Sequence, residues 1–243
     1  RDCHLEAYEA WRDSHHGWAW RAPDPENLLG AFDGRVITHS GERYRFAMAD
    51  GRPTVTFTSD DGDSRELPVH STVGVAPLQQ VLVETKPGRL QALDIAWDVA
   101  GARWYHLYPD QDLDTDDGLH WTGPYKTWNA RCAECHATNY DKGYDPRTRS
   151  YDSTFSEMGV GCEACHGPAE GHVAWAAATD DPAQDTVGTA GTKGFAIDLS
   201  GGGPDGEIEL CAGCHARREP LGASSPVPGT PCADSYRLAL LRE

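Results

Sequence analysis

The sequence predicts an α+β fold with much irregular structure, in which a small antiparallel β-meander in the first half precedes a second half of helices and loops. Apolar and polar residues alternate over residues 44–48 and again over residues 55–57, as in strands with one buried face. Asp50-Gly51 lies between these segments and is a strong signal for a tight hairpin turn. After about Gly118 the alternation ends, and cysteines and histidines become frequent among glycine-rich segments.

The first half contains further short elements. Residues 5–11 are good helix formers. Pro53, beside the hairpin turn, predicts that its strand lies at a sheet edge or begins late. Three more apolar segments, separated by turn residues such as Lys86-Pro87-Gly88, are predicted as strands: residues 65–70, 81–84 and 90–97.

In the second half, residues 173–178 and 207–218 have helical patterns and no strands are expected. We therefore divide the chain into a strand-bearing part, residues 1–117, and a helix-and-loop part, residues 118–243. The two parts are expected to form one unit rather than independent domains. Because the chain begins abruptly at Arg1, we also expect it to be a piece of a longer precursor.

The charge balance excludes some partners. The chain has 21 Lys and Arg against 38 Asp and Glu, a net charge of −17. Phosphate backbones and anionic membrane surfaces are bound by clustered basic side chains, so this balance argues against both. No run of about 18 apolar residues is present, so no membrane span is predicted. Two explanations of the acidity stay open, namely solubility and the steering of a basic redox partner.

The pattern CxxCH occurs three times in the second half. It is the signature of c-type haem attachment, in which two thiols bond to the porphyrin and the adjacent histidine becomes the proximal iron ligand. Three copies make coincidence negligible. The attachment residues are Cys132, Cys135, Cys162, Cys165, Cys211 and Cys214, and the proximal ligands are His136, His166 and His215.

Zinc sites and disulfides are the alternative uses of paired cysteines. Zinc does not require a histidine directly after the second cysteine, yet all three pairs have one. A disulfide scaffold would show a surplus of other cysteines, whereas only Cys3 and Cys232 remain. Haem c is therefore the expected cofactor.

The two remaining cysteines have two interpretations. Cys3-His4 is the end of a CxxCH motif whose first cysteine would lie just before Arg1, which predicts a fourth haem with His4 as proximal ligand. Alternatively, Cys3 and Cys232 form a disulfide that joins the chain ends. We favour the fourth haem, which leaves Cys232 without an assigned role.

Several segments resemble the multihaem cytochromes related to the tetrahaem cytochrome c of ammonia-oxidising bacteria, a family that includes long members fused to tetratricopeptide repeats. Relatives of this kind have a complete first CxxCH followed by a tryptophan and Ser-x-His, which supports a haem at Cys3-His4. They also continue past the equivalent of Leu241. The resemblance implies electron transfer but names no donor or acceptor. It rests on residues 11–16, 77–80, 88–91, 96–98, 103–109, 120–123, 128–129 and 162–168.

The surplus of histidines predicts bis-His irons, which suit electron transfer, and only two methionines compete as ligands. The distal candidates are His16, His120, His172 and His106. The resemblance points to His16 through Ser-x-His, although helical phase favours the neighbouring His15, which shares a face with His4.

Three functions follow from these expectations. The first is transfer of electrons between redox proteins in the periplasm or outside the cell, without a catalytic residue. The second is a reductase or oxidase of a small nitrogen or sulfur compound at a five-coordinate haem. The third is a subunit of a conducting cytochrome polymer or another larger assembly.

Overall fold

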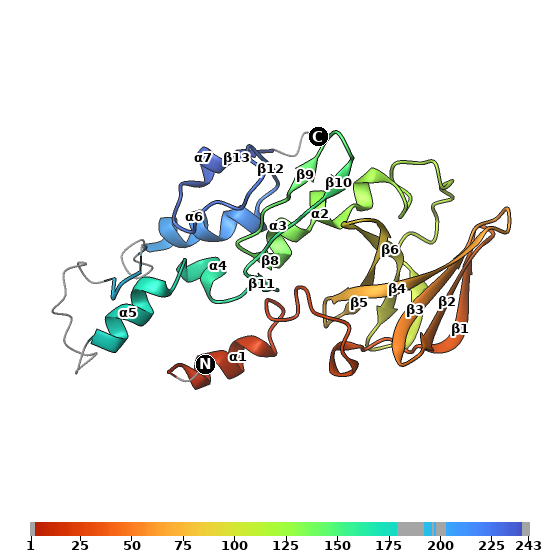
Figure 1. The fold of residues 1–243 in the computed structure, drawn as a ribbon, viewed down its shortest axis with the longest axis horizontal. Coiled ribbons are helices and arrows are strands. Elements are labelled where there is room, and N and C mark those ends of the chain that lie inside the picture. The colour runs from red at the N-terminus through yellow and green to blue at the C-terminus, as the bar shows by residue number, and fades with distance from the viewer. Residues whose placement is uncertain (1–2, 179–191, 196, 198–202, 240–243) are drawn as a thin grey trace.

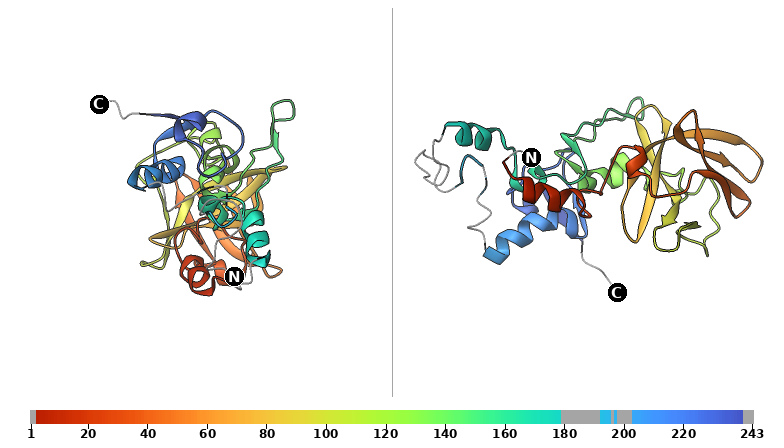
Figure 2. Two further views of the ribbon diagram at one scale, coloured as in Figure 1. Left: turned by 90° about the vertical axis from the view of Figure 1, so that its left-hand side faces the viewer. Right: turned by 90° about the horizontal axis from the view of Figure 1, so that it is seen from below.

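The computed structural model describes residues 3–178, 192–195, 197 and 203–239. The molecule is elongated, with a large β-sheet at one end and short helices at the other (Figures 1 and 2). Helix α1 (Leu5–Arg12) lies at the helical end, near α4 (Glu163–His166) and α5 (Glu170–Ala178), although it opens the chain. The chain therefore returns to its own beginning after it has formed the sheet.

The sheet is an antiparallel meander in which each strand pairs with the next along the chain. It is larger than the small meander that the sequence predicts, because residues 33–39 and 103–106 add a strand at either edge. The seven strands are β1 (Asp33–His39), β2 (Glu42–Ala49), β3 (Arg52–Thr58), β4 (Ser64–Val73), β5 (Leu78–Lys86), β6 (Arg89–Asp98) and β7 (Arg103–His106).

The predicted hairpin at Asp50-Gly51 is confirmed. Both residues have positive φ, 49° and 77°, and Ala49 pairs directly with Arg52, as in the two-residue turns that match strand twist. The position expected for Pro53 is wrong. It is the second residue of β3, which lies between β2 and β4, and its lost donor is tolerated because pairing with β4 begins only at Thr54.

Alternating side chains of the strands form the main hydrophobic core. Tyr44, Phe46, Val55 and Phe57 are buried between polar neighbours, as their spacing predicts. Trp121 belongs to the same core and meets the ring of Phe57 with centroids 5.1 Å apart. The segment just after residue 117 therefore packs with the sheet, while α1 packs with the helical end.

A second core joins the sheet to the helical end. Trp20, Leu82 and Leu90 pack there against Trp128 and Tyr140. Buried Asn129, in α2 (Trp128–Arg131), accepts a hydrogen bond from the backbone N–H of Leu90 at 2.8 Å. Residues of β5 and β6 thus position the segment that leads into the first complete CxxCH motif.

The helical end also contains strands, contrary to the prediction. Three two-stranded sheets are formed by β8 (Ala137–Thr138) with β11 (Glu157–Met158), β9 (Tyr144–Asp145) with β10 (Ser150–Tyr151), and β12 (Arg218–Pro220) with β13 (Tyr236–Leu238). These strands are two or three residues long, too short for a period-two pattern to signal. The predicted helices are present as α1, α5 and α6 (Gly203–His215), although α6 begins earlier than predicted and ends before Arg218, which begins β12. The remaining helices are α3 (Ala133–His136), α7 (Cys232–Ser235) and two 3-10 turns, η1 (Pro25–Asn27) and η2 (Pro124–Lys126).

Candidate haem-binding site

Each complete CxxCH motif forms one helical turn. In α3 and α4 the second cysteine and the histidine are helical, and the first cysteine is the N-cap residue. The third motif is the last turn of α6. Residues three apart lie on one face of a helix, so each turn presents its two thiols together. All six thiols are free.

The three motifs lie side by side. The thiols of Cys135 and Cys214 are hydrogen-bonded, which lowers the pKa of Cys135 to about 7 and raises the pKa of Cys214. Cys165 lies close enough to Cys211 for that thiol to raise its pKa, after the larger effect of burial. The motif at residues 211–215 therefore contacts the motif at residues 132–136 and lies near the motif at residues 162–166.

Two pairs of histidine rings bring distant segments together. The ring centroids of His4 and His172 are 6.0 Å apart, and those of His16 and His215 are 6.1 Å apart. A metal–imidazole bond is about 2.0–2.1 Å long, so two imidazoles on opposite sides of one metal have centroids about 6 Å apart. Both pairs have the separation that one iron between them requires.

Hydrogen bonds from Nδ1 orient two of the predicted iron ligands, His172 and His136. His172 donates from Nδ1 to the carbonyl of Lys193 at 2.9 Å, and its ring stacks on Phe195 at 4.4 Å. His136 donates from Nδ1 to the carbonyl of Ala19 at 2.8 Å, and burial lowers its pKa. Both hydrogen bonds fix the ring orientation through Nδ1 and leave Nε2 for a metal.

The structure places His120 and His106 away from the CxxCH motifs. His120 is buried in the sheet end, where Nε2 meets Glu42 at 3.2 Å and Nδ1 meets the hydroxyl of Thr122 at 2.7 Å. The prediction that His120 is a distal ligand is not supported, because both ring nitrogens already have partners. His106 stacks on His39, with centroids 3.7 Å apart, so it is likewise not placed as a ligand.

The structure bears on the two interpretations of Cys3, a disulfide with Cys232 and a haem at Cys3-His4. Cys3 is exposed and Cys232 is buried, and both are free, which contradicts a disulfide between them. His4 lies opposite His172, as a proximal ligand with a distal partner would. The backbone N–H of Cys232 donates to Glu209 at 2.7 Å, so this residue helps to fix α7 against α6.

An ion pair beside the motifs has no signature in the sequence. Arg218 contacts Glu134, which is the second variable residue of the motif at residues 132–136. Arg218 and Glu134 are far apart in the sequence, and arginine occurs often at surfaces, so this contact cannot be predicted without the structure.

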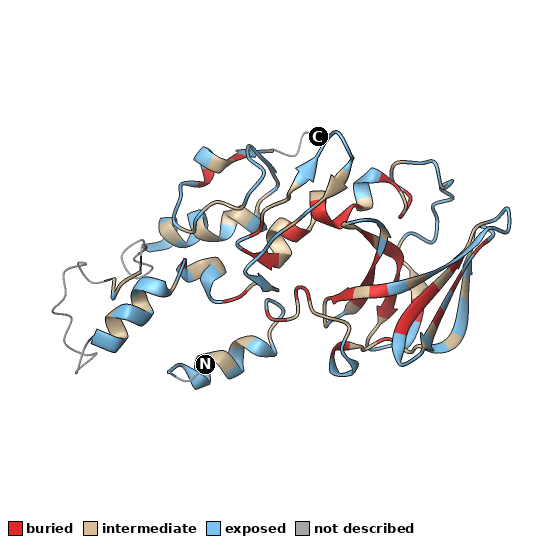
Figure 3. Ribbon diagram, viewed as in Figure 1, coloured by how far each residue is buried: buried red, intermediate tan, exposed pale blue. Residues whose placement is uncertain are grey.

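The helical end has little protein core of its own. Helices α1, α5 and α6 contain no buried residue, whereas the sheet is densely buried (Figure 3). Leu5, Val173 and Ile208 on these helices are more than half exposed. Isolated helices of this length need packing for stability, so their exposed apolar side chains are suited to contact an additional apolar group. A porphyrin held by the neighbouring cysteines fits that requirement.

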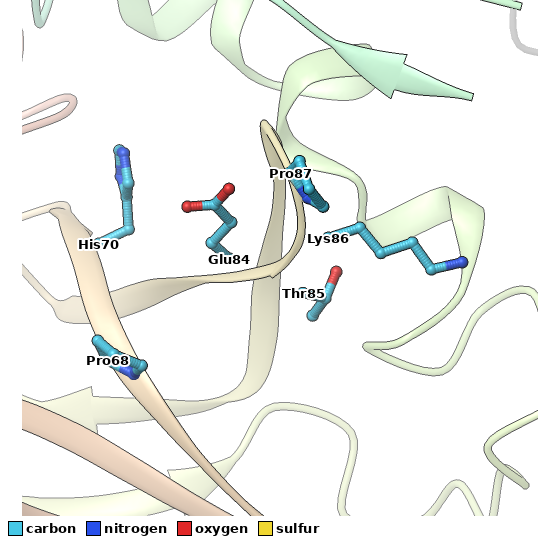
Figure 4. Close-up of a pocket in the computed structure, with 6 residues that line it drawn as sticks. All are labelled: Pro68, His70, Glu84, Thr85, Lys86 and Pro87. Carbon is cyan, nitrogen blue, oxygen red and sulfur yellow. The ribbon is translucent and has the colours of Figure 1, made fainter. Parts of the chain in front are cut away.

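A pocket of about 390 Å³ lies elsewhere, at the end of β4 and β5. His70 and Glu84 project into it from these strands, while the amine of Lys86 points away (Figure 4). Burial lowers the pKa of His70. Its lining contains no residue of a CxxCH motif, so this pocket contributes nothing to the haem site.

Among the residues that the structure describes, no helix is long and apolar enough to cross a membrane.

The family model described as cytochrome c554 and c-prime matches residues 108–167, which include two of the three complete CxxCH motifs. No curated protein matches the chain.

The fold is similar to a solved structure, the outer cell wall cytochrome OcwA, with a TM-score of 0.59 and 18% sequence identity. The match covers 98% of this chain and 43% of that one, so the chain spans less than half of that protein's length. The family match supports c-type haem at the two CxxCH motifs that it covers, and the likeness to OcwA shows a shared fold.

Proposed function

We propose that this chain holds four c-type haems and carries electrons between redox proteins outside the cytoplasm. The observation that supports this most directly is the crossed arrangement of the histidine pairs. His16, which follows Cys3-His4, faces His215 of the motif at residues 211–215, and His172, which follows the motif at residues 162–166, faces His4. Such an arrangement forces the attached groups to lie close together.

The proposed ligands follow from these contacts. His4 with His172 and His16 with His215 form two bis-His sites, and His136 and His166 are the proximal ligands of the other two. His106 and His120 are omitted because of where they lie. When bound, each haem supplies an iron that takes up and releases one electron.

The chain's own residues position these ligands. The carbonyls of Ala19 and Lys193 fix the ring orientations of His136 and His172 and make both imidazoles stronger electron donors to a metal. Phe195 and Trp175 stack on the His172 ring and help to fix its plane. No acid, base or nucleophile is needed for electron transfer.

The experiment for the carrier function mixes the reduced, haem-loaded protein with nitrite, hydroxylamine and tetrathionate in the absence of any protein partner. Slow reoxidation by all three supports a carrier. Rapid catalytic reoxidation by one of them favours the second candidate, a reductase. That candidate is retained because, in the described part of the chain, the ring contacts of His136 and His166 include no second histidine.

The proposed partners are redox proteins, and a basic partner suits the net charge of −17. Stopped-flow reduction across a salt series tests this point. Steering predicts a rate that falls as ionic strength rises past about 0.1 M, where the screening length is about 10 Å. A flat rate assigns the charge to solubility.

Location in the periplasm or outside the cell is proposed because haem is attached covalently there. Sedimentation of the loaded protein tests for a larger assembly.

A further inference from the structure

Arg218 lies three residues after His215, at the start of β12, and its side chain is only 8% exposed. Its guanidinium group donates to Glu134 at 3.1 Å, to Cys135 Sγ at 3.1 Å and to the carbonyl of Gly213. These three acceptors belong to two CxxCH motifs, at residues 132–136 and 211–215. One cation therefore bridges both motifs.

Glu134 is the matching anion. Its other carboxylate oxygen accepts a hydrogen bond from Tyr236 Oη at 3.0 Å, and its side chain is 19% exposed. The ring of Tyr236 lies 3.9 Å below the guanidinium carbon of Arg218. Both charges are thus held in place by several contacts and are shielded from water.

The position of Arg218 Nη2 matters chemically. It contacts the sulfur of Cys135, the atom that becomes a thioether bonded to the porphyrin on attachment. A thioether sulfur still accepts a weak hydrogen bond. A buried charge at this distance is little screened by salt. A cation stabilises the reduced iron, which carries one positive charge fewer, and an anion stabilises the oxidised iron.

We propose that Arg218 and Glu134 set the reduction potential of the haem attached to Cys132 and Cys135 by opposing contributions, the guanidinium raising it and the carboxylate lowering it. This inference rests on the proposed attachment of haem at that motif. It assigns a redox role to two residues that bind no iron.

The test compares four variants of the haem-loaded protein with the unchanged protein: Arg218→Gln, Arg218→Lys, Glu134→Gln, and the double variant Arg218→Gln with Glu134→Gln. Arg217→Gln is the matched control, because Arg217 is exposed one residue earlier. Redox titration with a spectroscopy that resolves single haems gives each potential at low and high salt. Peptide mass spectrometry counts attached haem at Cys132 and Cys135 in every sample.

Arg218→Gln is expected to lower the potential of one haem, and Glu134→Gln to raise that of the same haem. Each shift is expected to change the ratio of oxidised to reduced haem about tenfold at a fixed potential, or about 59 mV for one electron. Arg218→Lys keeps the positive charge, so its reduction potential is expected to stay close to that of the unchanged protein. The double variant returns toward the unchanged protein, and Arg217→Gln gives a smaller shift that salt abolishes.

Shifts of the same sign in Arg218→Gln and Glu134→Gln, or a shift in Arg217→Gln as large as in Arg218→Gln, overturn the inference. If the Arg218 variants fail to load haem, the isosteric Glu134→Gln decides alone, and an unchanged potential there overturns it. Absence of haem at Cys132 and Cys135 in the unchanged protein refutes the proposed attachment instead, so the two failures are distinguishable.

Discussion

The imidazole rings of His16 and His215 lie with their centroids 6.1 Å apart, although the two residues come from opposite ends of the chain. The rings are inclined at 61°, and the backbone of His16 is held by a hydrogen bond from the N–H of Val160 at 3.1 Å. The segment that follows Cys3-His4 is thus fixed to the segment that precedes the motif at residues 162–166. Protein contacts therefore bring the two rings together, and an iron bound between them would add to this closure.

Replacement of His16 by Ala is expected to turn one haem from low-spin to high-spin, because it removes a sixth ligand. His15→Ala is the matched control, since the neighbouring His15 is the alternative that helical phase favours. Electronic absorption and EPR of the oxidised protein measure the spin state. A high-spin haem in His15→Ala together with an unchanged His16→Ala would reverse the assignment.

Replacement of His172 by Ala is expected to turn a different haem high-spin, the one attached through Cys3. The double variant with His16→Ala should therefore show two more high-spin haems than the unchanged protein. If the single variant leaves the spectrum unchanged, His172 is not a ligand. If the double variant gains only one high-spin haem, the two histidines do not serve separate irons.

His120→Ala is expected to lower the free energy of unfolding by about 1–3 kcal/mol, because buried Glu42 loses one of its hydrogen-bond partners and keeps Tyr44. The haem spectrum should not change. Chemical denaturation measures the first effect and absorption the second. Glu66→Ala, at an exposed position on β4, is the control and should stay within about 0.5 kcal/mol. A new high-spin haem in His120→Ala would restore His120 as a ligand.

The stability of the sheet end is expected to fall as the pH drops below about 6.5, the ordinary pKa of histidine. Burial, and then the neighbouring His39, lower the pKa of His106, with opposing effects from Asp94 and Glu42. The unfolded chain then takes up the proton at a higher pH than the folded one, so acid favours unfolding. Between pH 5 and 7.5, the free energy of unfolding of His106→Gln should depend less on pH than that of the unchanged protein. An equal slope would exclude His106 as the source of the pH dependence.

Protein made without haem attachment is expected to keep the sheet and lose order in α1, α5 and α6, which bury no residue of their own. Hydrogen exchange of this form should protect amides in β2 to β6 and leave those helices unprotected. Equal protection in the haem-free and loaded forms would show that the helices need no porphyrin to pack.

The sequence predicts the sheet well because its strands have one buried face, as at Tyr44 and Phe46. It cannot predict the strands of two residues, which depend on neighbours brought in from elsewhere. A motif identifies covalent ligands such as Cys132, since the chemistry lies within five residues. Distal ligands are harder, because only the fold tells that His120 is bonded to Glu42 while His172 faces His4.

The central claim is tested most directly by counting haems on the intact mature protein, with a pyridine haemochrome assay alongside its intact mass. The proposed sites predict four covalently bound haems, three through the complete motifs and one through Cys3 and a cysteine just before Arg1. A count of three would remove the site at Cys3-His4, and a mass without attached haem would contradict the proposed function altogether.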